Sequence, residues 1–259
     1  ITVPGPTGDK AIIDTAEAHT GFDNSASGQV NAAVGEVVRY SVTIDVPQGS
    51  MANLSLVDTL EAGLFFPLPA DNNITIQANG FAAPGNLIAP NLPAGVTAGP
   101  VTLDPSRVNI VGQVVTFDFG AIQNNEVDPG AVETLTISYN AIVSNDDGTN
   151  VFRGNVLTNT AQVQVNGANS GPATTMDVTV VEPNLTITKS DGGVTSADAG
   201  DVISYTLTVT ADNVANATTA FDLSITDSVP AELEIVGGTL AFAGLPGYVA
   251  SSSVNAVGQ

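Results

Sequence analysis

The residues that could carry out acid–base or nucleophilic chemistry in this 259-residue chain are few and mostly acidic. His19 is the single histidine, and the absence of cysteine removes disulfides, thiolate nucleophiles and thiolate metal ligands together. Acid pairs such as Asp146–Asp147 and Asp198/Asp201 could in principle hydrolyse glycosides, but their separation in space decides that reaction. Because an acidic chain contains many such pairs and no nucleophile motif accompanies His19, we expect no enzymatic activity.

Calcium binding is the chemistry that the acidic loops suit best. Hard cations prefer oxygen ligands from carboxylates, amides and backbone carbonyls gathered on loops. The candidate ligands are Asp146 and Asp147 in the segment SNDDGTN (144–150), and Glu182, Asn184 and Asp212 at a predicted domain junction. The first segment also fits a hairpin turn that caps its own backbone, and the second a plain linker. The sequence therefore predicts calcium sites as regions and leaves their geometry open.

The charge balance excludes several classes of partner. The chain has 26 Asp and Glu against 5 Lys and Arg, a formal net charge of −21. Such a chain repels phosphate backbones and anionic lipids, so we expect no nucleic acid partner. No stretch approaches the ~18 apolar residues of a membrane span, so we also expect no direct membrane insertion. The sequence begins at Ile1 without a signal-like segment, as expected of a piece of a longer, processed protein.

Short stretches rich in Val, Ile, Leu and Thr, bounded by turn residues, predict an all-β protein without long helices. The predicted strands are 10–15, 36–46, 53–59, 73–78, 107–111, 114–119, 132–143, 156–166, 174–182, 184–190, 201–210, 220–227 and 233–242. In 36–46 the alternation places Tyr40 on the apolar face, and Tyr139 and Tyr205 are likewise predicted core residues. The Pro-rich region 67–105 is predicted to leave the sheet as a lid, a contact surface or a loop.

The sequence contains an internal repeat. GEVVRYSVTI (35–44) returns as GDVISYTLTV (200–209), and LSLVDTLEAGLFF (54–66) returns as LSITDSVPAELEI (223–235), which pairs Asp58 with Asp227. The repeat predicts two domains, 1–182 with the insertion 67–105 and 183–259, joined at Glu182-Pro183-Asn184. After position 209 there is no counterpart of TLTISYNAIV or LTNTAQVQV, so we expect the second repeat to be incomplete. Polypeptide beyond Gln259 or strands of another chain would complete it.

These motifs carry a resemblance to known surface proteins. AGDVISYTLTVT followed by TDSVPAEL resembles the repeat domain of unknown function that is strung in tandem along bacterial and archaeal surface proteins. The longer first copy, with GEVVRYSVTIDVPQG, LVDTLEAGL, FDFGAI, ETLTISYNAIV and LTNTAQVQV, is similar to the related fimbrial-type isopeptide-forming domain. The resemblance covers most of both domains and implies tandem immunoglobulin-like β-sandwiches used as spacer, stalk or adhesive modules.

The fimbrial resemblance also implies a Lys–Asn isopeptide bond beside a carboxyl group in an apolar setting. Lys10 is the only lysine of the first predicted domain, Asn159 in LTNTA is a candidate partner, and Asp58 is a candidate acid. An alignment of KAIIDT with NLTITKS, however, places Asp14 or Thr15 at the position of Lys189. That alignment favours the simpler interpretation, in which Lys10 is exposed and no bond forms.

Together these observations predict an extracellular, cell-surface protein of tandem β-sandwiches that acts as a structural or adhesive module. Its expected partners are neighbouring repeats, other copies of the chain and a surface ligand that the sequence does not identify. The alternative is a subunit of an ordered surface assembly, a fibre or a surface layer, with the Pro-rich region making subunit contacts. The expected cofactor is Ca²⁺.

Overall fold

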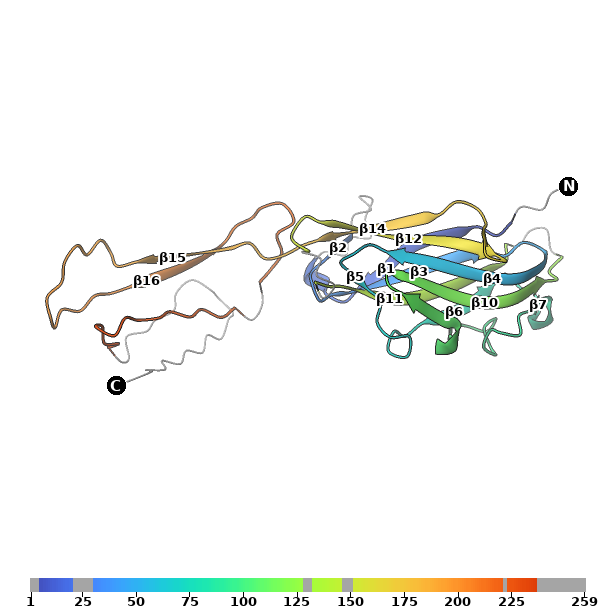
Figure 1. Cartoon of the computed structure of the whole chain (residues 1–259), viewed down its shortest axis with the longest axis horizontal. Helices are drawn as coiled ribbons and strands as arrows, with labels where there is room; N and C mark the ends of the chain where they lie inside the picture. Colours follow the sequence, from blue (N-terminus) through green and yellow to red (C-terminus); the bar gives the residue numbers. More distant parts are fainter. Residues whose placement is uncertain (1–4, 21–29, 128–131, 146–150, 221–222, 237–259) are drawn as a thin grey trace. The chain divides into compact units, whose positions relative to one another are not determined.

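The first part of the chain folds into two sheets that pack face to face. The computed structural model describes residues 5–20, 30–127, 132–145, 151–220 and 223–236 (Figure 1). One sheet has the order β1 (Gly8–Thr15), β3 (Val37–Asp45), β11 (Thr134–Val143), β6 (Thr75–Asn79) and β8 (Val101–Thr102), with β5 (Leu64–Phe65) also paired to β11.

The second sheet has the order β2 (Val30–Ala32), β14 (Thr174–Val180), β12 (Val156–Val165), β4 (Gly49–Leu60), β10 (Val114–Asn124) and β7 (Leu87–Ile88). In addition, β13 (Ala168–Asn169) pairs with β12, and β9 (Val108–Val111) pairs with β10. The helical elements of the described residues are short 3-10 turns at Ala18–Thr20, Pro84–Asn86 and Pro105–Arg107. The predicted all-β sandwich is confirmed.

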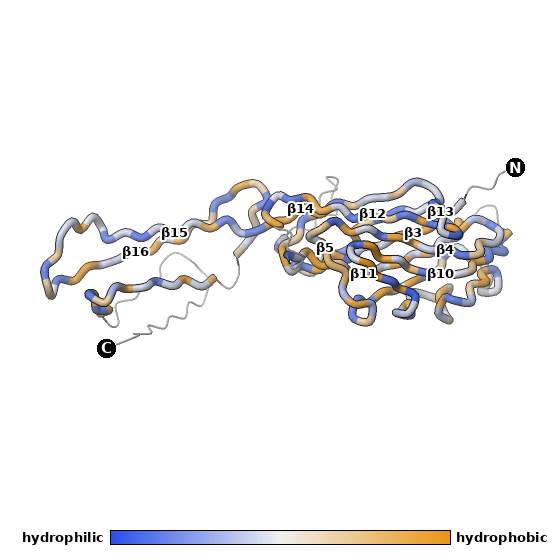
Figure 2. The backbone as a smooth tube through the Cα atoms, in the orientation of Figure 1, coloured by the Kyte–Doolittle hydropathy of each residue, from blue (hydrophilic) through white to orange (hydrophobic). Residues whose placement is uncertain are grey.

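Period-two alternation places one face of each central strand in the core. In β3 the side chains of Val38, Tyr40, Val42 and Ile44 are fully buried, and the residues between them are partly exposed. The same alternation runs along β11 and β12, and Figure 2 shows it as changing hydropathy along the strands. The strand pattern of the sequence is thus the pattern of a sandwich interior.

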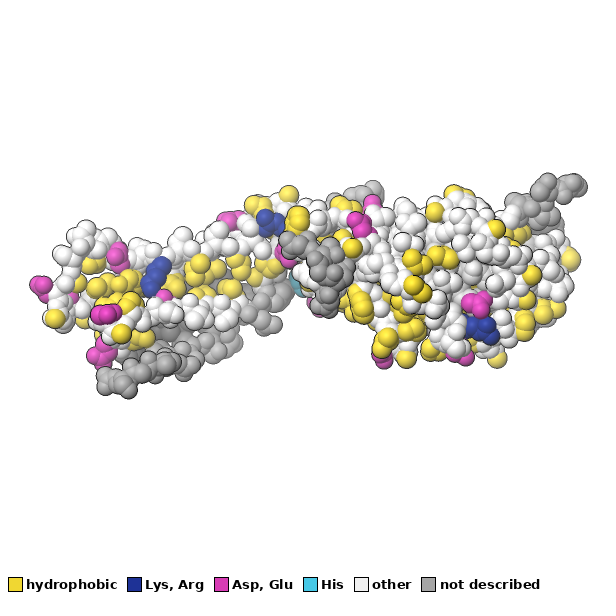
Figure 3. Space-filling view, in the orientation of Figure 1, with side chains coloured by type: hydrophobic (Ala, Val, Ile, Leu, Met, Phe, Trp, Pro, Cys, Tyr) yellow, Lys and Arg dark blue, Asp and Glu magenta, His cyan; other side chains and the backbone are white. Residues whose placement is uncertain are grey.

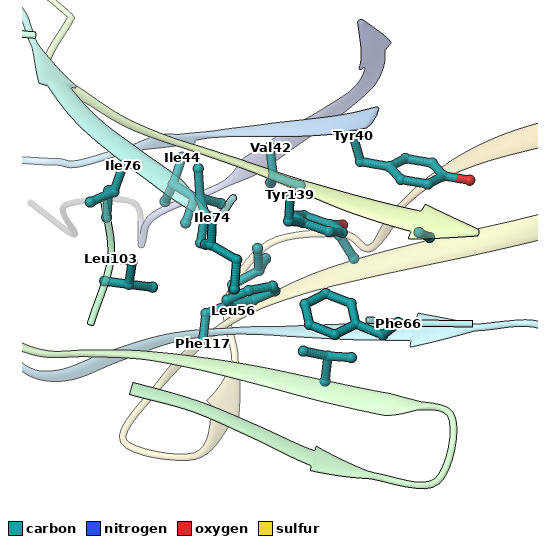
Figure 4. Close-up of a cluster of buried hydrophobic side chains, with 14 of the residues drawn as sticks. Tyr40, Val42, Ile44, Leu56, Phe66, Ile74, Ile76, Leu103, Phe117 and Tyr139 are labelled. Atoms are coloured by element: carbon teal, nitrogen blue, oxygen red, sulfur yellow. The ribbon is translucent and has the colours of Figure 1, made fainter. Parts of the chain in front are cut away.

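Aromatic side chains fill the space between the sheets. Phe117 of β10 packs against Tyr139 of β11 with ring centroids 5.0 Å apart, and Phe66 contacts both rings at 5.9 to 6.0 Å (Figure 4). Such tilted and edge-on ring pairs stabilise a core beyond the burial of their surface. The predictions that Tyr40 and Tyr139 are core residues are confirmed.

The Pro-rich region 67–105 contributes β6 and β8 to the first sheet and β7 to the second. Its strand β6 pairs with β11, and β8 extends the sheet beyond β6. Ile74, Ile76 and Leu103 of this region are almost fully buried and belong to the main core (Figure 4). Between the strands the chain makes turns, so the region combines a sheet extension with surface loops.

The residues after the sandwich form less regular structure. Strands β15 (Leu185–Ser190) and β16 (Thr206–Ala211) pair with each other as an antiparallel two-stranded sheet. The strand predicted at 220–227 is wrong for residues 223–227, which form no strand, and 233–236 are not in a strand either. In the first copy the matching residues 54–58 lie in β4 between β10 and β12. The described residues after β16 contain no counterpart of those two neighbouring strands, on which the strand of the first copy depends.

The chain divides into two compact units, residues 1–220 and 221–259. The domain boundary that the repeat predicts between 182 and 183 stays a prediction. No helix of the described residues is long and apolar enough to cross a membrane. Figure 3 shows that uncharged polar groups and backbone cover much of the sandwich surface, with scattered acidic side chains.

Candidate crosslinking site

Lys10 lies inside the sandwich. It is on β1, pairs with Val42 of β3, and the residue as a whole is 4% exposed. In β1 the inward side chains are Lys10 and Ile12, and Ala11 and Ile13 face outward. The interpretation of Lys10 as an exposed lysine is therefore wrong, because an amine occupies an inward position of the strand.

Asp58 and Asn159 face the same interior from the opposite sheet. Both residues are fully buried. Asp58 of β4 pairs with Ala161 of β12, so Asn159 is two residues from the position directly opposite Asp58. Diagonal neighbours of this kind on adjacent strands share one face of a sheet and lie within reach of each other. The structure thus brings together three residues that are 48 to 149 positions apart in the sequence.

Two tyrosines complete the surroundings of the amine. Tyr40 of β3 and Tyr139 of β11 are directly opposite each other, and their rings are stacked at 5.8 Å. The Lys10 Nζ donates hydrogen bonds to Asp58 Oδ1 and, over 2.9 Å, to the Tyr139 hydroxyl. It also lies 4.9 Å from the centre of the Tyr40 ring. The sequence identified both tyrosines as core residues but gave no sign that they flank the lysine.

Burial shifts the two titratable partners toward their neutral forms. Desolvation lowers the pKa of Lys10 to about 8, even though the nearby Asp58 carboxylate works in the opposite direction. Desolvation likewise raises the pKa of Asp58, and the Lys10 ammonium only partly offsets that rise. At a pKa of about 8, roughly a tenth of the amines would be neutral at pH 7, several hundred times more than at the ordinary value. A neutral amine is the nucleophilic form of lysine.

Unsatisfied polar atoms gather around these residues. Among the described residues, the buried side-chain atoms without a hydrogen-bond partner include Tyr40 Oη, Asp58 Oδ2 and both Nδ2 and Oδ1 of Asn159. Asn159 lies close enough to Tyr40, Asp58 and Tyr139 to influence their pKa values, but its amide makes no hydrogen bond of regular geometry. Folded proteins rarely leave buried polar groups in this state, so the cluster calls for an explanation.

Two other buried acids show what a structural carboxylate looks like in the same molecule. Glu36 accepts hydrogen bonds from the backbone N–H groups of Glu17 and Ala33 and from the Thr20 hydroxyl. Glu126 accepts hydrogen bonds from the Ala82 and Val127 N–H groups, among others. These carboxylates tie loops to the sandwich. Asp58 differs because its hydrogen-bond donor is the Lys10 amine, which is itself flanked by the side chains of Tyr40 and Tyr139.

The arrangement contains the groups that an acyl transfer onto an amine requires. The Lys10 Nζ would attack Cγ of Asn159, forming the Nζ–Cγ bond, and the Cγ–Nδ2 bond would break with release of ammonia. A protonated Asp58 would donate a hydrogen bond to Asn159 Oδ1, which polarises the carbonyl group, and would pass its proton to the leaving nitrogen. The amine's own proton would return to the Asp58 carboxylate. The protonation states that burial favours are those that the reaction needs.

The predicted calcium ligands are only partly brought together. Asp146 and Asp147 lie outside the described residues. Asn184 Nδ2 donates to Asp212 Oδ2 over 3.3 Å, and the Asp212 N–H donates to the Asn184 carbonyl over 2.9 Å. Glu182 accepts a hydrogen bond from the Arg153 N–H. Within the described parts of the chain there is no group of three or more His, Cys, Asp or Glu side chains that could hold a metal ion.

The other candidate chemical residues stabilise local structure. His19 Nδ1 lies 3.5 Å from Glu17 Oε2 beside a 3-10 turn. Asp201 Oδ2 accepts the Asp198 N–H over 2.8 Å, and the Asp201 N–H donates to the Asp198 carbonyl, so this acid pair closes a turn. Turn formation is the ordinary role of Asp at such positions.

The strand registers correct the alignment of the two lysines. Lys10 pairs with Val42 in β1–β3, and Lys189 pairs with Leu207 in β15–β16. Val42 and Leu207 occupy the same position of the repeated segments 35–44 and 200–209. Lys189 is therefore the counterpart of Lys10, and the alignment that placed Asp14 or Thr15 there is wrong. The pairing of β1 with β3 changes register between Ile12 and Asp14, so Asp14 and Thr15 do not continue the alternation of the residues before them.

Comparisons with known proteins identify related architectures at low similarity. No protein-family profile matches the sequence, and no curated protein matches it either. Among solved structures, the major pilin subunit BcpA of Bacillus cereus aligns with 82% of this chain and 56% of its own, with 14% identity and a TM-score of 0.41. The pilus backbone RrgB of Streptococcus pneumoniae aligns with 62% of this chain and 32% of its own, with 15% identity and a TM-score of 0.37.

A third similar structure is the N-terminal domain of the Streptococcus gordonii adhesin Sgo0707, which aligns with 69% of this chain and 33% of its own at 14% identity and a TM-score of 0.38. The chain thus spans between about a third and just over half of the length of these structures.

Proposed function

We propose that this chain is an extracellular structural module of a cell-surface protein, and that its sandwich is locked by an isopeptide bond between Lys10 and Asn159. The observation that carries the proposal is the buried set of Lys10, Asp58 and Asn159, in which burial shifts the amine and the acid toward their neutral forms. Without cysteine the chain cannot use disulfides, so another covalent crosslink would replace them.

The position of the bond suits a module that carries tension. Lys10 is on the first strand of one sheet, and Asn159 is on β12 of the other sheet, whose neighbour β14 is the last strand of the sandwich. A force applied to the chain on both sides of the sandwich would pass through the bond and bypass residues 11–158. Spacer and stalk modules, and subunits of fibres or surface layers, need this resistance to extension. Binding of calcium at the region of Glu182, Asn184 and Asp212 would stiffen the junction and is part of the proposal.

Intact mass under denaturing conditions tests the bond. The whole chain should be lighter than its sequence mass by about 17 Da, one ammonia, and a peptide map should contain Lys10 and Asn159 in one crosslinked product. The Lys10→Arg variant should have the full sequence mass, because its guanidinium stays protonated and cannot attack. Lys189→Arg is the matched control and should keep the loss. A wild-type chain with the full sequence mass would contradict the proposed crosslink.

A further inference from the structure

Tyr139 accepts the second hydrogen bond of the buried amine. The Lys10 Nζ donates to two acceptors, Asp58 Oδ1 of the facing sheet and the Tyr139 hydroxyl at 2.9 Å. Tyr139 is fully buried on β11, and its ring packs against Phe117 at 5.0 Å and Phe66 at 5.9 Å (Figure 4). Because a close-packed interior holds a ring in place, this hydroxyl is a fixed acceptor.

The neighbouring tyrosine provides a comparison within the same molecule. Tyr40 lies directly opposite Tyr139 on β3, and the two rings are stacked at 5.8 Å. Both are fully buried, and the Lys10 Nζ lies 4.9 Å from the centre of the Tyr40 ring. The Tyr40 hydroxyl, however, makes no hydrogen bond. Of these two similar phenols, that of Tyr139 is the one bonded to the amine.

The two hydrogen bonds determine the direction of the amine's lone pair. A neutral lysine amine has two N–H bonds and one lone pair around Nζ, in addition to the bond to its own side chain. With one N–H donated to Asp58, the lone pair could still occupy either of the two remaining directions. Donation of the other N–H to Tyr139 selects one of them. The correct orientation of a nucleophile contributes strongly to the rate of its reaction.

We propose that Tyr139 is a positioning residue of the crosslinking reaction, which holds one N–H of Lys10 and so directs the lone pair of the amine at Cγ of Asn159. The lone pair forms the Nζ–Cγ bond, and the N–H that faces Asp58 gives its proton to that carboxyl group. The Cγ–Nδ2 bond breaks as Nδ2 takes up a proton from Asp58 and leaves as ammonia. The other N–H stays on Nζ, becomes the N–H of the new amide and remains donated to Tyr139. The inference rests on the proposed function, because it assigns a residue to that reaction.

The Tyr139 hydroxyl suits the role of an acceptor that keeps its own proton. The titratable side chains around the Lys10 amine are those of Asp58 on β4, Tyr40 on β3 and Tyr139 on β11. Burial, followed by the nearby Asp58 carboxylate, raises the pKa of Tyr139 well above its ordinary value, and the pKa of Tyr40 is raised for the same reasons. Both phenols therefore stay neutral, and Asp58 is the member of the three that exchanges protons during the reaction.

Refolding of the unlinked whole chain tests the assignment. Chain purified from inclusion bodies in urea, with its full sequence mass verified, is diluted into sucrose buffer, which favours the folded state of every variant. Intact mass follows the loss of ammonia, and circular dichroism gives the folded fraction. We expect folded Tyr139→Phe to lose ammonia about 100-fold more slowly than the wild type, as for a misplaced nucleophile. Tyr40→Phe should slow the reaction much less, and Tyr205→Phe, next to β16, should not slow it.

The pH dependence separates positioning from titration. The pKa of Lys10 is about 8 in the folded chain, so roughly nine-tenths of the amines are neutral at pH 9. A defect that arose from the protonation of the amine would disappear at and above that pH. We expect the defect of Tyr139→Phe to persist from pH 7 to pH 10, because the lone pair remains misdirected after the amine has lost its charge.

The outcomes separate the two proposals. A wild type that folds without losing ammonia contradicts the proposed function and this inference with it. A wild type that loses ammonia, with Tyr139→Phe reacting at the same rate, overturns the inference alone. Equal slowing of Tyr139→Phe and Tyr40→Phe would assign the effect to the aromatic pair, and a defect that disappears above pH 9 would assign it to protonation. Either result also overturns the positioning role of Tyr139.

Discussion

Replacing Lys10 by methionine and Asp58 by leucine together should reveal the crosslink through the sign of the stability change. Methionine keeps the length and unbranched shape of the lysine stem but has no nucleophile, so the bond cannot form. A bond between residues 10 and 159 closes a loop of about 150 residues, which in the chain-entropy model corresponds to roughly 5 kcal/mol of stabilisation against unfolding. For a folded unit of this size, that loss would lower Tm by about 10 to 20 °C.

Without a bond the same double substitution should act in the opposite direction. The buried Lys10–Asp58 pair would then be held by charge and hydrogen bonding alone, at the cost of desolvating both groups. Replacing both members of a buried ion pair by apolar side chains removes that cost, whereas Lys10→Met alone would leave Asp58 buried without its amine and would destabilise the fold in either case. The double change would be neutral or stabilising by up to a few kcal/mol.

Calorimetry of the wild type, Lys10→Met/Asp58→Leu, Asp58→Asn and Lys189→Met distinguishes these cases. Asp58→Asn keeps both bond-forming residues but removes the acid, so it should lose the ammonia release and show a similar fall in Tm. Lys189→Met should leave the sandwich transition unchanged. A Lys10→Met/Asp58→Leu variant that melts at or above the wild-type temperature would refute the reasoning, whatever its mass.

Three further predictions concern titration, metal and a structural acid. In the unlinked variant Asn159→Ala, the free energy of unfolding should rise between pH 8 and 10.5, because in this range Lys10 of the unfolded chain, with its ordinary pKa of 10.5, binds more protons than Lys10 of the folded chain. Urea unfolding at each pH measures this rise. The control variant, which carries both Asn159→Ala and Lys10→Met, should not show it. Millimolar calcium should stabilise the folded chain by about 2.7 kcal/mol at a hundred times Kd and so raise Tm more than sodium at matched ionic strength. Asp212→Asn should reduce the difference, and equal Tm values would leave only screening. Glu36→Gln should lower the free energy of unfolding by about 1–3 kcal/mol, measured with urea, because the new amide nitrogen cannot accept the hydrogen bond of the Ala33 N–H. The loss of ammonia should persist in this variant. An unchanged free energy of unfolding would show that this carboxylate does not hold the loop in place.

Much of the fold could be predicted because strand formation leaves a local pattern. The alternation in 36–46, 132–143 and 156–166 gave β3, β11 and β12 to within two residues. Pairing was not predictable in the same way: β6, from a Pro-rich region, lies beside β11, about 60 residues away in sequence. Residues 223–227 have a strand-like sequence but form no strand, because a ladder also needs a neighbour.

The sequence by itself determined the all-β class and the repeated segments, and its resemblance to fimbrial-type domains pointed to Lys10, Asp58 and Asn159 as candidates for a crosslink. Only the tertiary structure decided that Lys10 faces inward, since KAIIDT alternates ambiguously and β1 changes register after Ile12. It also decided that Asp58 and Asn159 lie on the facing sheet, where burial shifts the pKa values of Lys10 and Asp58 toward neutral forms. The physical reason is that desolvation and contact between two sheets depend on residues far apart in the chain, which no local periodicity records.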